Sequence, residues 1–215
     1  FNMAFVPMFS KKLETGDDPE GFASDALSGL ATVLFALTLL AKLVMPWLVL
    51  AMAGGFAGDA RLPLATEFGR IVFPYILLIS LAALCSGALN ALGRFAAAAA
   101  APVLLNIILV AAMLLARAGV DPAQQADEAA AGLAGLTVGR ALCWAALLAG
   151  LAQLALVWEA ARRAGVWIVP RRPRLTPELK RLAVIAALAA LAGGVVQVNL
   201  LVGRQVASFF EGAIA

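Results

Sequence analysis

Long hydrophobic blocks alternate with short polar connections along this chain of 215 residues. Each complete block has about 20 residues or more, which is the length of helix that crosses roughly 30 Å of hydrocarbon in a bilayer. The pattern therefore predicts an all-α, polytopic membrane helix bundle with five complete spans and part of one more. The complete spans are expected at residues 24–56, 63–90, 95–117, 133–158 and 182–210, and the partial one at residues 1–10.

The connections carry turn-forming and helix-breaking residues. Residues 13–21 contain Gly16, Pro19 and four acids, so they are expected to form a loop, with Ser24 as the candidate cap of the next helix. Gly93-Arg94 predicts a very short turn and thus an antiparallel helix hairpin. Pro46 and Pro74 lie inside spans, where proline removes a backbone hydrogen bond and bends the helix.

Composition supports a membrane class. Hydrophobic residues make up 63% of the chain and charged residues 13%, with a mean hydropathy of +0.96. A soluble domain has about a quarter of its residues charged. The chain opens without a basic, cleavable leader and closes inside a helix-like segment. We therefore expect both ends to be cuts in a longer protein.

The positive charges indicate the orientation of the spans. When the connections are assigned to alternate sides, ten basic residues fall on one side and two on the other. Basic connections face the cytoplasm in multi-pass proteins, so the side with ten is predicted to be cytoplasmic. Those ten are Lys11, Lys12, Arg94, Arg162, Arg163, Arg171, Arg172, Arg174, Lys180 and Arg181, and the other two are Arg61 and Arg117.

Several function classes are disfavoured by the residues present. The chain has no histidine, and its two cysteines, Cys85 and Cys143, lie inside apolar blocks, so no metal or cofactor site is expected. No catalytic constellation or nucleic-acid module is recognisable, so the chain is not expected to be an enzyme or to bind nucleic acid. The basic stretch 162–181 lies between two spans, where topology and anionic lipid head groups explain it better than RNA does.

Polar side chains at membrane depth are the candidate functional residues. Lys42 either faces a hydrated cavity, extends to the interface or pairs with another helix. Arg70 and Arg140 lie in the first turns of their helices and are interpreted as interface anchors. A polar stripe marks the last span and lines either a cavity or a helix seam. The stripe and its neighbours comprise Gln197, Asn199, Arg204, Gln205, Ser208 and Glu211.

Some segments resemble a known transporter family. Residues 70–75 (Arg-Ile-Val-Phe-Pro-Tyr) and 87–95 (Gly-Ala-Leu-Asn-Ala-Leu-Gly-Arg-Phe) resemble the fourth helix, and the turn after it, of the MurJ/MviN family of lipid II flippases. Residues 2–9 are similar to the end of that family's second helix. Softer similarities, at residues 101–106 and 197–213, fit the fifth and seventh helices.

The resemblance implies a fragment of a fourteen-helix, two-lobe transporter. Residues 1–181 would form helices of the N-terminal lobe with a basic cytoplasmic linker, and residues 182–215 would form helix 7, the start of the second lobe. The family flips lipid II, an undecaprenyl-pyrophosphate-linked disaccharide-pentapeptide, from the cytoplasmic to the periplasmic leaflet by alternating access. A multi-pass protein of the bacterial inner membrane, monomeric at full length and in contact with the lipid bilayer, is implied.

The family's main cavity arginines lie in helices outside these residues. Many members carry an acid just before the position of Arg204, where this chain has Gly203. Sodium coupling through that helix is therefore not expected. Two alternatives remain open at this point. One is another exporter of the same superfamily, for drugs or oligosaccharide-lipids, and the other is a non-transporting membrane scaffold subunit.

Overall fold

The computed structural model describes residues 2–56, 61–118, 137–172 and 176–207. In this part of the chain the regular structure is entirely helical, which confirms the predicted class. The elements are α1 (Asn2–Thr15), α2 (Pro19–Leu43), α3 (Met45–Met52), the 3₁₀ turn η1 (Gly54–Phe56), α4 (Arg61–Val72), α5 (Tyr75–Ala91), α6 (Ala96–Arg117), α7 (Val138–Arg163) and α8 (Pro177–Ala207).

Four segments of the described chain are long and apolar enough to cross a membrane. They are Pro19–Leu43, Arg61–Ala91, Ala96–Arg117 and Val138–Arg163, and they coincide with four of the five predicted spans. The fifth prediction, residues 182–210, coincides with α8, which has 31 residues and is not among these four. At about 1.5 Å per residue, a helix of that length reaches about 46 Å.

The ends of several elements differ from the sequence prediction. The expected loop at residues 13–21 is wrong at both ends, because α1 continues to Thr15 and α2 begins at Pro19. Asp18 caps α2 by accepting the backbone N–H of Gly21 at 2.9 Å, with proline in the first turn. Ser24 is therefore not the cap. It lies inside α2 and is buried.

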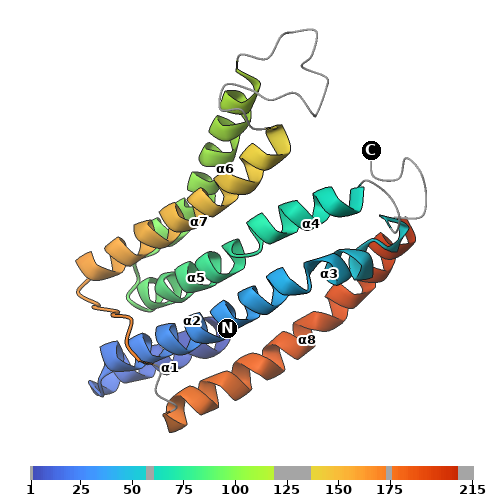
Figure 1. The fold of residues 1–215 in the computed structure, drawn as a ribbon. Helices are drawn as coiled ribbons and strands as arrows, with labels where there is room; N and C mark the ends of the chain where they lie inside the picture. The colour runs from blue at the N-terminus through green and yellow to red at the C-terminus, as the bar shows by residue number, and fades with distance from the viewer. Residues whose placement is uncertain (1, 57–60, 119–136, 173–175, 208–215) are drawn as a thin grey trace.

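Both prolines predicted to bend spans do interrupt helices. The span predicted at residues 24–56 breaks at Val44, between α2 and α3, where Pro46 lacks the N–H that would bond to Lys42. The span predicted at residues 63–90 breaks before Tyr75, between α4 and α5, at Pro74. Figure 1 shows the two broken helices side by side, each with its break toward the same end of the bundle.

The helices pack as neighbouring layers. In Figure 1, the α6–α7 hairpin lies on one side of α4 and α5, and α8 lies on the far side of α2 and α3. The core is centred on the end where α1 meets α2 and α5. There the rings of Phe5 and Phe9 stack at 5.4 Å, and those of Phe5 and Phe22 at 5.8 Å. Phe5, Phe9 and Leu84 are fully buried.

The outer surface of the bundle is apolar. Val103, Ile107 and Leu114 on one face of α6 are 56%, 60% and 61% exposed. Such a continuous apolar face would be unstable in water and is expected where lipid covers it. Together with the four apolar helices, it identifies a multi-pass membrane protein.

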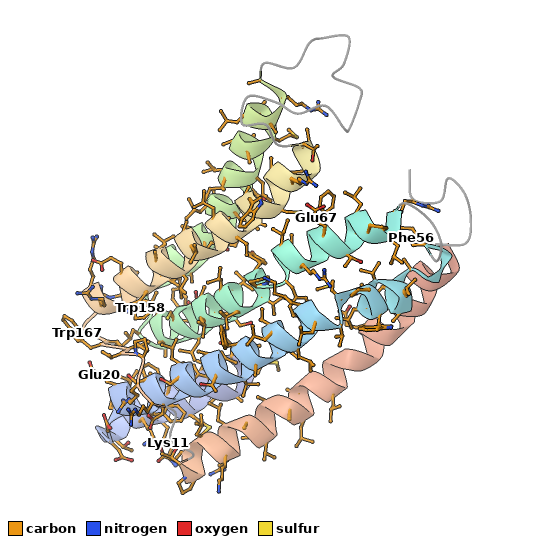
Figure 2. All side chains as sticks on the ribbon, viewed as in Figure 1. Lys11, Glu20, Phe56, Glu67, Trp158 and Trp167 are labelled. Carbon is orange, nitrogen blue, oxygen red and sulfur yellow. The ribbon has the colours of Figure 1, made fainter. Side chains whose placement is uncertain are left out.

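One end of the bundle gathers the basic connections. The α1–α2 turn, the α5–α6 turn and residues 164–172 after α7 all lie at this end in Figure 1. Figure 2 places Lys11, Trp158 and Trp167 here, with Glu67 and Phe56 toward the opposite end. The basic residues of these connections that the structure describes therefore lie together, as the alternation predicted; Arg174 lies outside the described residues. Below, this end is called the basic end and the other the outer end.

Candidate functional site

The predicted polar stripe falls mostly outside what the structure describes. Gln197 is exposed on α8, and Gly194, three residues earlier on the same helix face, opens onto space with no neighbouring atom within 4 Å of an added Cβ. That face is thus open within the described residues. The helix includes Asn199, Arg204 and Gln205, whose side chains lie outside the described part, as do Ser208 and Glu211 entirely.

Lys42, the remaining predicted site residue, lies at the proline break between α2 and α3. Its side chain is exposed, and its carbonyl oxygen is the one that Pro46 leaves without a helical partner. Arg70 of α4 supplies that partner, because its Nε donates to the Lys42 oxygen at 3.1 Å. An unpaired carbonyl is costly at membrane depth. Arg70 therefore holds the break. The prediction that it lies in the first turn of its helix as an interface anchor is wrong about its position, because Arg70 lies in the last turn of α4.

The same contact brings α3 and α4 close together. An added Cβ at Gly69 would lie 2.7 Å from Sδ of Met45, so the absence of a side chain permits the approach. Arg70 is also the residue four positions before Pro74, so its own carbonyl loses a helical partner as well. Two broken helices thus meet at their breaks. We call the residues from Lys42 to Pro46 and from Thr66 to Pro74 the outer joint.

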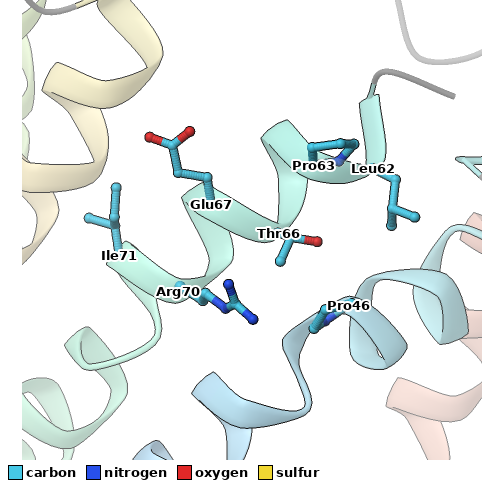
Figure 3. Close-up of a pocket in the computed structure, with 7 residues that line it drawn as sticks. All are labelled: Pro46, Leu62, Pro63, Thr66, Glu67, Arg70 and Ile71. Carbon is cyan, nitrogen blue, oxygen red and sulfur yellow. The ribbon is translucent and has the colours of Figure 1, made fainter.

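A cavity of about 480 Å³ opens at the outer joint. Figure 3 shows Arg70 and Thr66 pointing toward Pro46 across this space, while the carboxylate of Glu67 points away from it. Thr66 is 7% exposed, and its Oγ1 is buried without a hydrogen-bond partner in the described structure. The residues that line the cavity are Pro46, Leu62, Pro63, Thr66, Glu67, Arg70 and Ile71.

Glu67 joins α4 to α7. Its two carboxylate oxygens accept from Nε and Nη2 of Arg140 at 2.8 and 3.0 Å, which is the two-pronged geometry that favours arginine over lysine. Arg140 belongs to the first turn of α7, which Thr137 caps. The sequence pattern predicted Arg140 to be an interface anchor and did not indicate Glu67 as its partner.

A second contact missed from the sequence lies deeper in the bundle. Gln153 of α7 is 1% exposed; its Nε2 donates to the carbonyl of Ala101 at 2.7 Å, and its Oε1 accepts from the hydroxyl of Tyr75 at 3.3 Å. The side chain therefore ties α7 to α5 and α6. Nearby, an added Cβ at Gly150 would lie 2.8 Å from the Tyr75 ring. Both residues fix the distance between helices.

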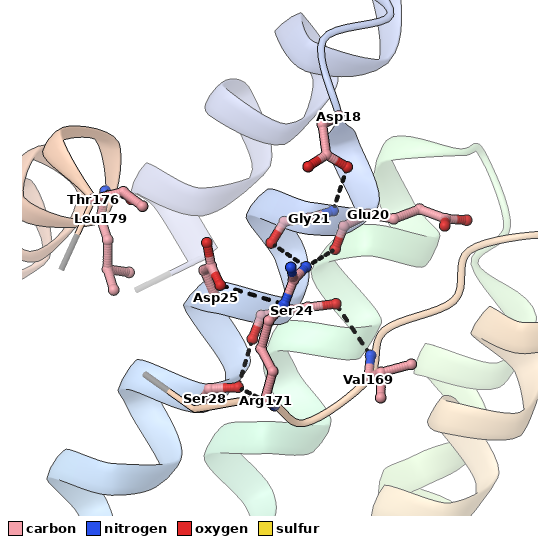
Figure 4. A network of polar contacts seen from close by, with 10 residues as sticks. All are labelled: Asp18, Glu20, Gly21, Ser24, Asp25, Ser28, Val169, Arg171, Thr176 and Leu179. Atoms are coloured by element: carbon pink, nitrogen blue, oxygen red, sulfur yellow. Dashed lines mark hydrogen bonds and ion pairs between the residues drawn. The ribbon is translucent and has the colours of Figure 1, made fainter. Parts of the chain in front are cut away.

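At the basic end, the chain that follows α7 is docked on α2. We call residues 164–172 the strap. Figure 4 shows it running along one side of α2. The backbone N–H groups of alternate strap residues donate to side chains one helical turn apart. Trp167 donates to Glu20 Oε1 at 3.1 Å, Val169 to Ser24 Oγ at 3.1 Å, and Arg171 to Ser28 Oγ at 2.9 Å.

The register follows from the dimensions of the two elements. Two residues of extended chain advance about 6.6 Å, and four residues of helix advance about 6.0 Å. Every second N–H of the strap therefore meets every fourth residue of α2. Between these contacts Ile168 points inward and is 2% exposed.

Arg171 adds a charged contact to the strap. Its Nη2 donates to the Gly21 carbonyl at 2.8 Å, and its Nε lies 3.3 Å from Oδ1 of Asp25 (Figure 4). From the sequence, topology and anionic lipid head groups were expected to explain the whole basic stretch. For Arg171 this is incomplete, because the guanidinium is used inside the protein. Arg162 is also engaged, since its guanidinium lies 5.1 Å from the centroid of the Trp167 ring.

Lys12 ties the other connections at the basic end together. Its Nζ lies 3.1 Å from Asp17 and 3.0 Å from Glu178 at the start of α8. Burial alone would lower the pKa of Lys12, but the hydrogen bonds and charges of Glu178 and Asp17 outweigh it and raise the pKa above its usual value. Lys12 thus holds the start of α8, and hydrogen bonds to α2 hold the strap that precedes it.

The described residues do not bring together a group of three or more Cys, Asp or Glu side chains that could hold a metal ion. The contacts described above instead set the positions of the helices relative to one another. Broken helices, an open face on α8 and a docked strap are features suited to a protein whose helices move relative to one another.

Comparison with known proteins points to one family. A family model described as "Lipid II flippase MurJ" matches residues 1–215. A protein of Rhizobium meliloti (strain 1021) named "Probable lipid II flippase MurJ" is 44% identical over all of this chain and 39% of its own length. A protein of that name from Rhizobium tropici is 41% identical over the same shares. The "Lipid II flippase MurJ" of Burkholderia cenocepacia is 31% identical over all of this chain and 40% of its own length. The chain thus spans about two fifths of these relatives.

Proposed function

We propose a transport function for this chain, which belongs to the lipid II flippase MurJ family. On this proposal the full-length protein flips lipid II from the cytoplasmic to the periplasmic leaflet by alternating access, for cell-wall synthesis. The observation that carries the proposal is the family match over residues 1–215, together with relatives of that name at 44% and 41% identity. It favours this cargo over the drug or oligosaccharide-lipid export considered as an alternative, and over a scaffold role.

The structure supports the proposal in physical terms. Apolar faces on the outside of the bundle suit a protein embedded in lipid, and we propose the bacterial inner membrane as its location. The basic end would face the cytoplasm. Both broken helices have their breaks toward the outer end, where a change of helix angle would open or close that side of the protein.

The segment's place in the whole protein follows from the same proposal. Residues 1–181 would belong to the first lobe and residues 182–215 would begin the second. The open face at Gly194 and Gln197 would then border the space between the lobes. We retain the polar residues there, with Lys42, as candidates for the transport path. They are Gln197, Asn199, Arg204, Gln205, Ser208 and Glu211.

The reaction would move a lipid without making or breaking a covalent bond, and the full-length protein would act as a monomer. The lipid-linked disaccharide-pentapeptide has an anionic pyrophosphate, which must lose hydration to cross the bilayer. Hydrogen bonds from cationic side chains compensate that loss. No cofactor is needed for this chemistry.

Complementation of a flippase-depleted bacterium tests the proposal. The full-length protein should restore growth, and lipid II should become accessible on the outer leaflet to an externally added enzyme that cleaves it. Gln197→Leu and Arg204→Leu are expected to reduce accessible lipid II, while Val103→Ala on the lipid-facing side of α6 should not. Normal membrane levels of the full-length protein, with no lipid II reaching the outer leaflet, would refute the function.

A further inference from the structure

Two cations in the outer half of the bundle lack a carboxylate partner among the described residues. Lys42 and Arg70 are both exposed, and neither takes part in an ion pair of the described chain. Arg70 lies nine residues from the start of the Arg61–Ala91 span, about 14 Å along its axis. Unpaired charge at this depth is costly and marks a place where an opposite charge binds.

The Arg70 guanidinium is already oriented. Its Nε is bound to the Lys42 carbonyl, which leaves the two Nη groups at the forked end of the side chain. The contact fixes the direction of that fork at the outer joint. A guanidinium held in this way matches the spacing of two oxygens on a phosphate group better than a lysine would.

Thr66 is the second, independent observation. It lies one turn before Arg70 on the same face of α4, and Figure 3 shows both side chains pointing to the Pro46 side of the cavity. Its hydroxyl is buried and has no hydrogen-bond partner in the described structure. Buried hydroxyls are nearly always satisfied, so an unsatisfied one lining a cavity indicates a missing ligand.

The nearest carboxylate does not cancel the charge of the cavity. Glu67 contributes to the lining, but its carboxylate is bound on both oxygens by Arg140 and points away from Arg70 (Figure 3). The space of about 480 Å³ is therefore bordered by one oriented cation, a free hydroxyl and apolar walls. This combination favours an anion with several acceptor oxygens and disfavours a metal cation.

We propose that the cavity at the outer joint binds a phosphate-class oxyanion through the Nη groups of Arg70 and the hydroxyl of Thr66, with Lys42 adding charge nearby. The inference rests on the proposed function for its role, since a pyrophosphate-linked cargo would meet this site in the outer half of its path. A phospholipid head group has the same chemistry and is the other source of such an anion.

Local protection of an engineered thiol measures binding at this site rather than elsewhere. Leu62 lines the cavity, so Leu62→Cys is introduced into the full-length protein with every native cysteine, Cys85 and Cys143 included, replaced by alanine. The rate at which a charged, water-soluble thiol reagent modifies it is measured with increasing inorganic pyrophosphate. Pyrophosphate should slow the reaction, and a phosphatidylglycerol vesicle is the parallel probe for the lipid source.

Two substitutions separate binding from folding. Arg70→Gln should weaken pyrophosphate protection by about tenfold or more, because it removes a charged donor. Thr66→Val keeps the shape and leaves the contact of Arg70 with Lys42 intact, and it should weaken protection by about fivefold. Arg94→Gln, in the exposed turn at the basic end, is the matched control and should change nothing.

Each outcome decides the proposal. Protection by pyrophosphate, or by phosphatidylglycerol alone, that weakens by about fivefold in Thr66→Val supports the site and identifies the source of the anion. Protection by neither probe, or protection that Thr66→Val leaves unaltered, overturns it. The readout does not require lipid II movement, so a protein that binds pyrophosphate here but fails in the complementation assay would refute the proposed function alone.

Discussion

Replacing Ser24 and Ser28 together by alanine would remove two of the hydrogen bonds that dock the strap on α2. The two hydroxyls accept the backbone N–H groups of Val169 and Arg171, and no substitute acceptor is described near either donor. Val169 is exposed, so water can reach its N–H after release, which places the cost at about 1 kcal/mol per bond. One kcal/mol corresponds to about a fivefold change in an opening equilibrium.

Hydrogen–deuterium exchange of the full-length protein in lipid nanodiscs measures that opening directly. The amides of residues 169 and 171 belong to no helix, so their protection depends on the serine contacts. Each amide loses its own bond of about 1 kcal/mol, so the exchange of each is expected to accelerate about fivefold in the double variant. The amide of Trp167 should change less, because Glu20 still accepts its N–H.

A control separates this effect from a general weakening of α2. Thr32 lies one turn beyond Ser28, and its hydroxyl donates to the Ser28 carbonyl within the helix without touching the strap. Thr32→Val should leave the exchange of residues 169 and 171 unchanged. Equal exchange in the serine double variant and the parent would refute the docked strap, since those amides would then be protected by something else.

Three further experiments test the contacts between helices. Gly150→Ala should destabilise the full-length protein by about 1–3 kcal/mol through overpacking, as measured by unfolding in detergent, whereas Gly194→Ala meets open space and should not. Gln153→Leu should cost about 1–3 kcal/mol in the same assay, because it removes two hydrogen bonds inside the bundle. Glu67→Arg and Arg140→Glu should each lower the melting temperature, and the double exchange should recover part of the loss.

Each of these has a result that would count against the structure. Equal stability of the two glycine variants would mean that α7 does not approach α5 as closely as described. A neutral Gln153→Leu would mean that the buried amide is not bonded. Additive losses in the Glu67 and Arg140 exchange would mean that the two residues act independently.

The spans were predictable because membrane-crossing helices depend on a property of each segment alone. A block of about 20 apolar residues satisfies its own backbone and needs no partner to be recognised. The same holds for the breaks at Pro46 and Pro74, since proline removes a donor wherever it lies. Four spans and both breaks followed from such local rules.

The boundaries at the basic end were less predictable because two local signals compete there. Asp18-Pro19-Glu20 resembles a helix start. Together with Glu14, Gly16 and Asp17, however, it also forms a polar, acidic stretch that resembles a loop. The structure resolves this in favour of the helix. Asp18 adopts a left-handed conformation, with φ of 41°, and caps α2.

The contacts between distant segments could not be predicted from one sequence. The strap pairs residue 169 with residue 24 through a backbone N–H, which carries no sequence signature of its own. Arg70 was noticed as a charge near the interface, but its partner is a carbonyl freed by a proline in another helix. Only the arrangement of the helices in space reveals such pairs.

The orientation of the bundle in the membrane is the claim on which the direction of transport depends. In the full-length protein with its native cysteines replaced by alanine, Arg172→Cys places a thiol in the strap and Ala118→Cys places one at the outer end of α6, both at exposed positions. A membrane-impermeant maleimide added to intact cells should label the thiol at position 118 and spare the one at 172 until the cells are opened. Labelling of position 172 from outside, with position 118 protected, would contradict both the orientation and the proposed direction of flipping.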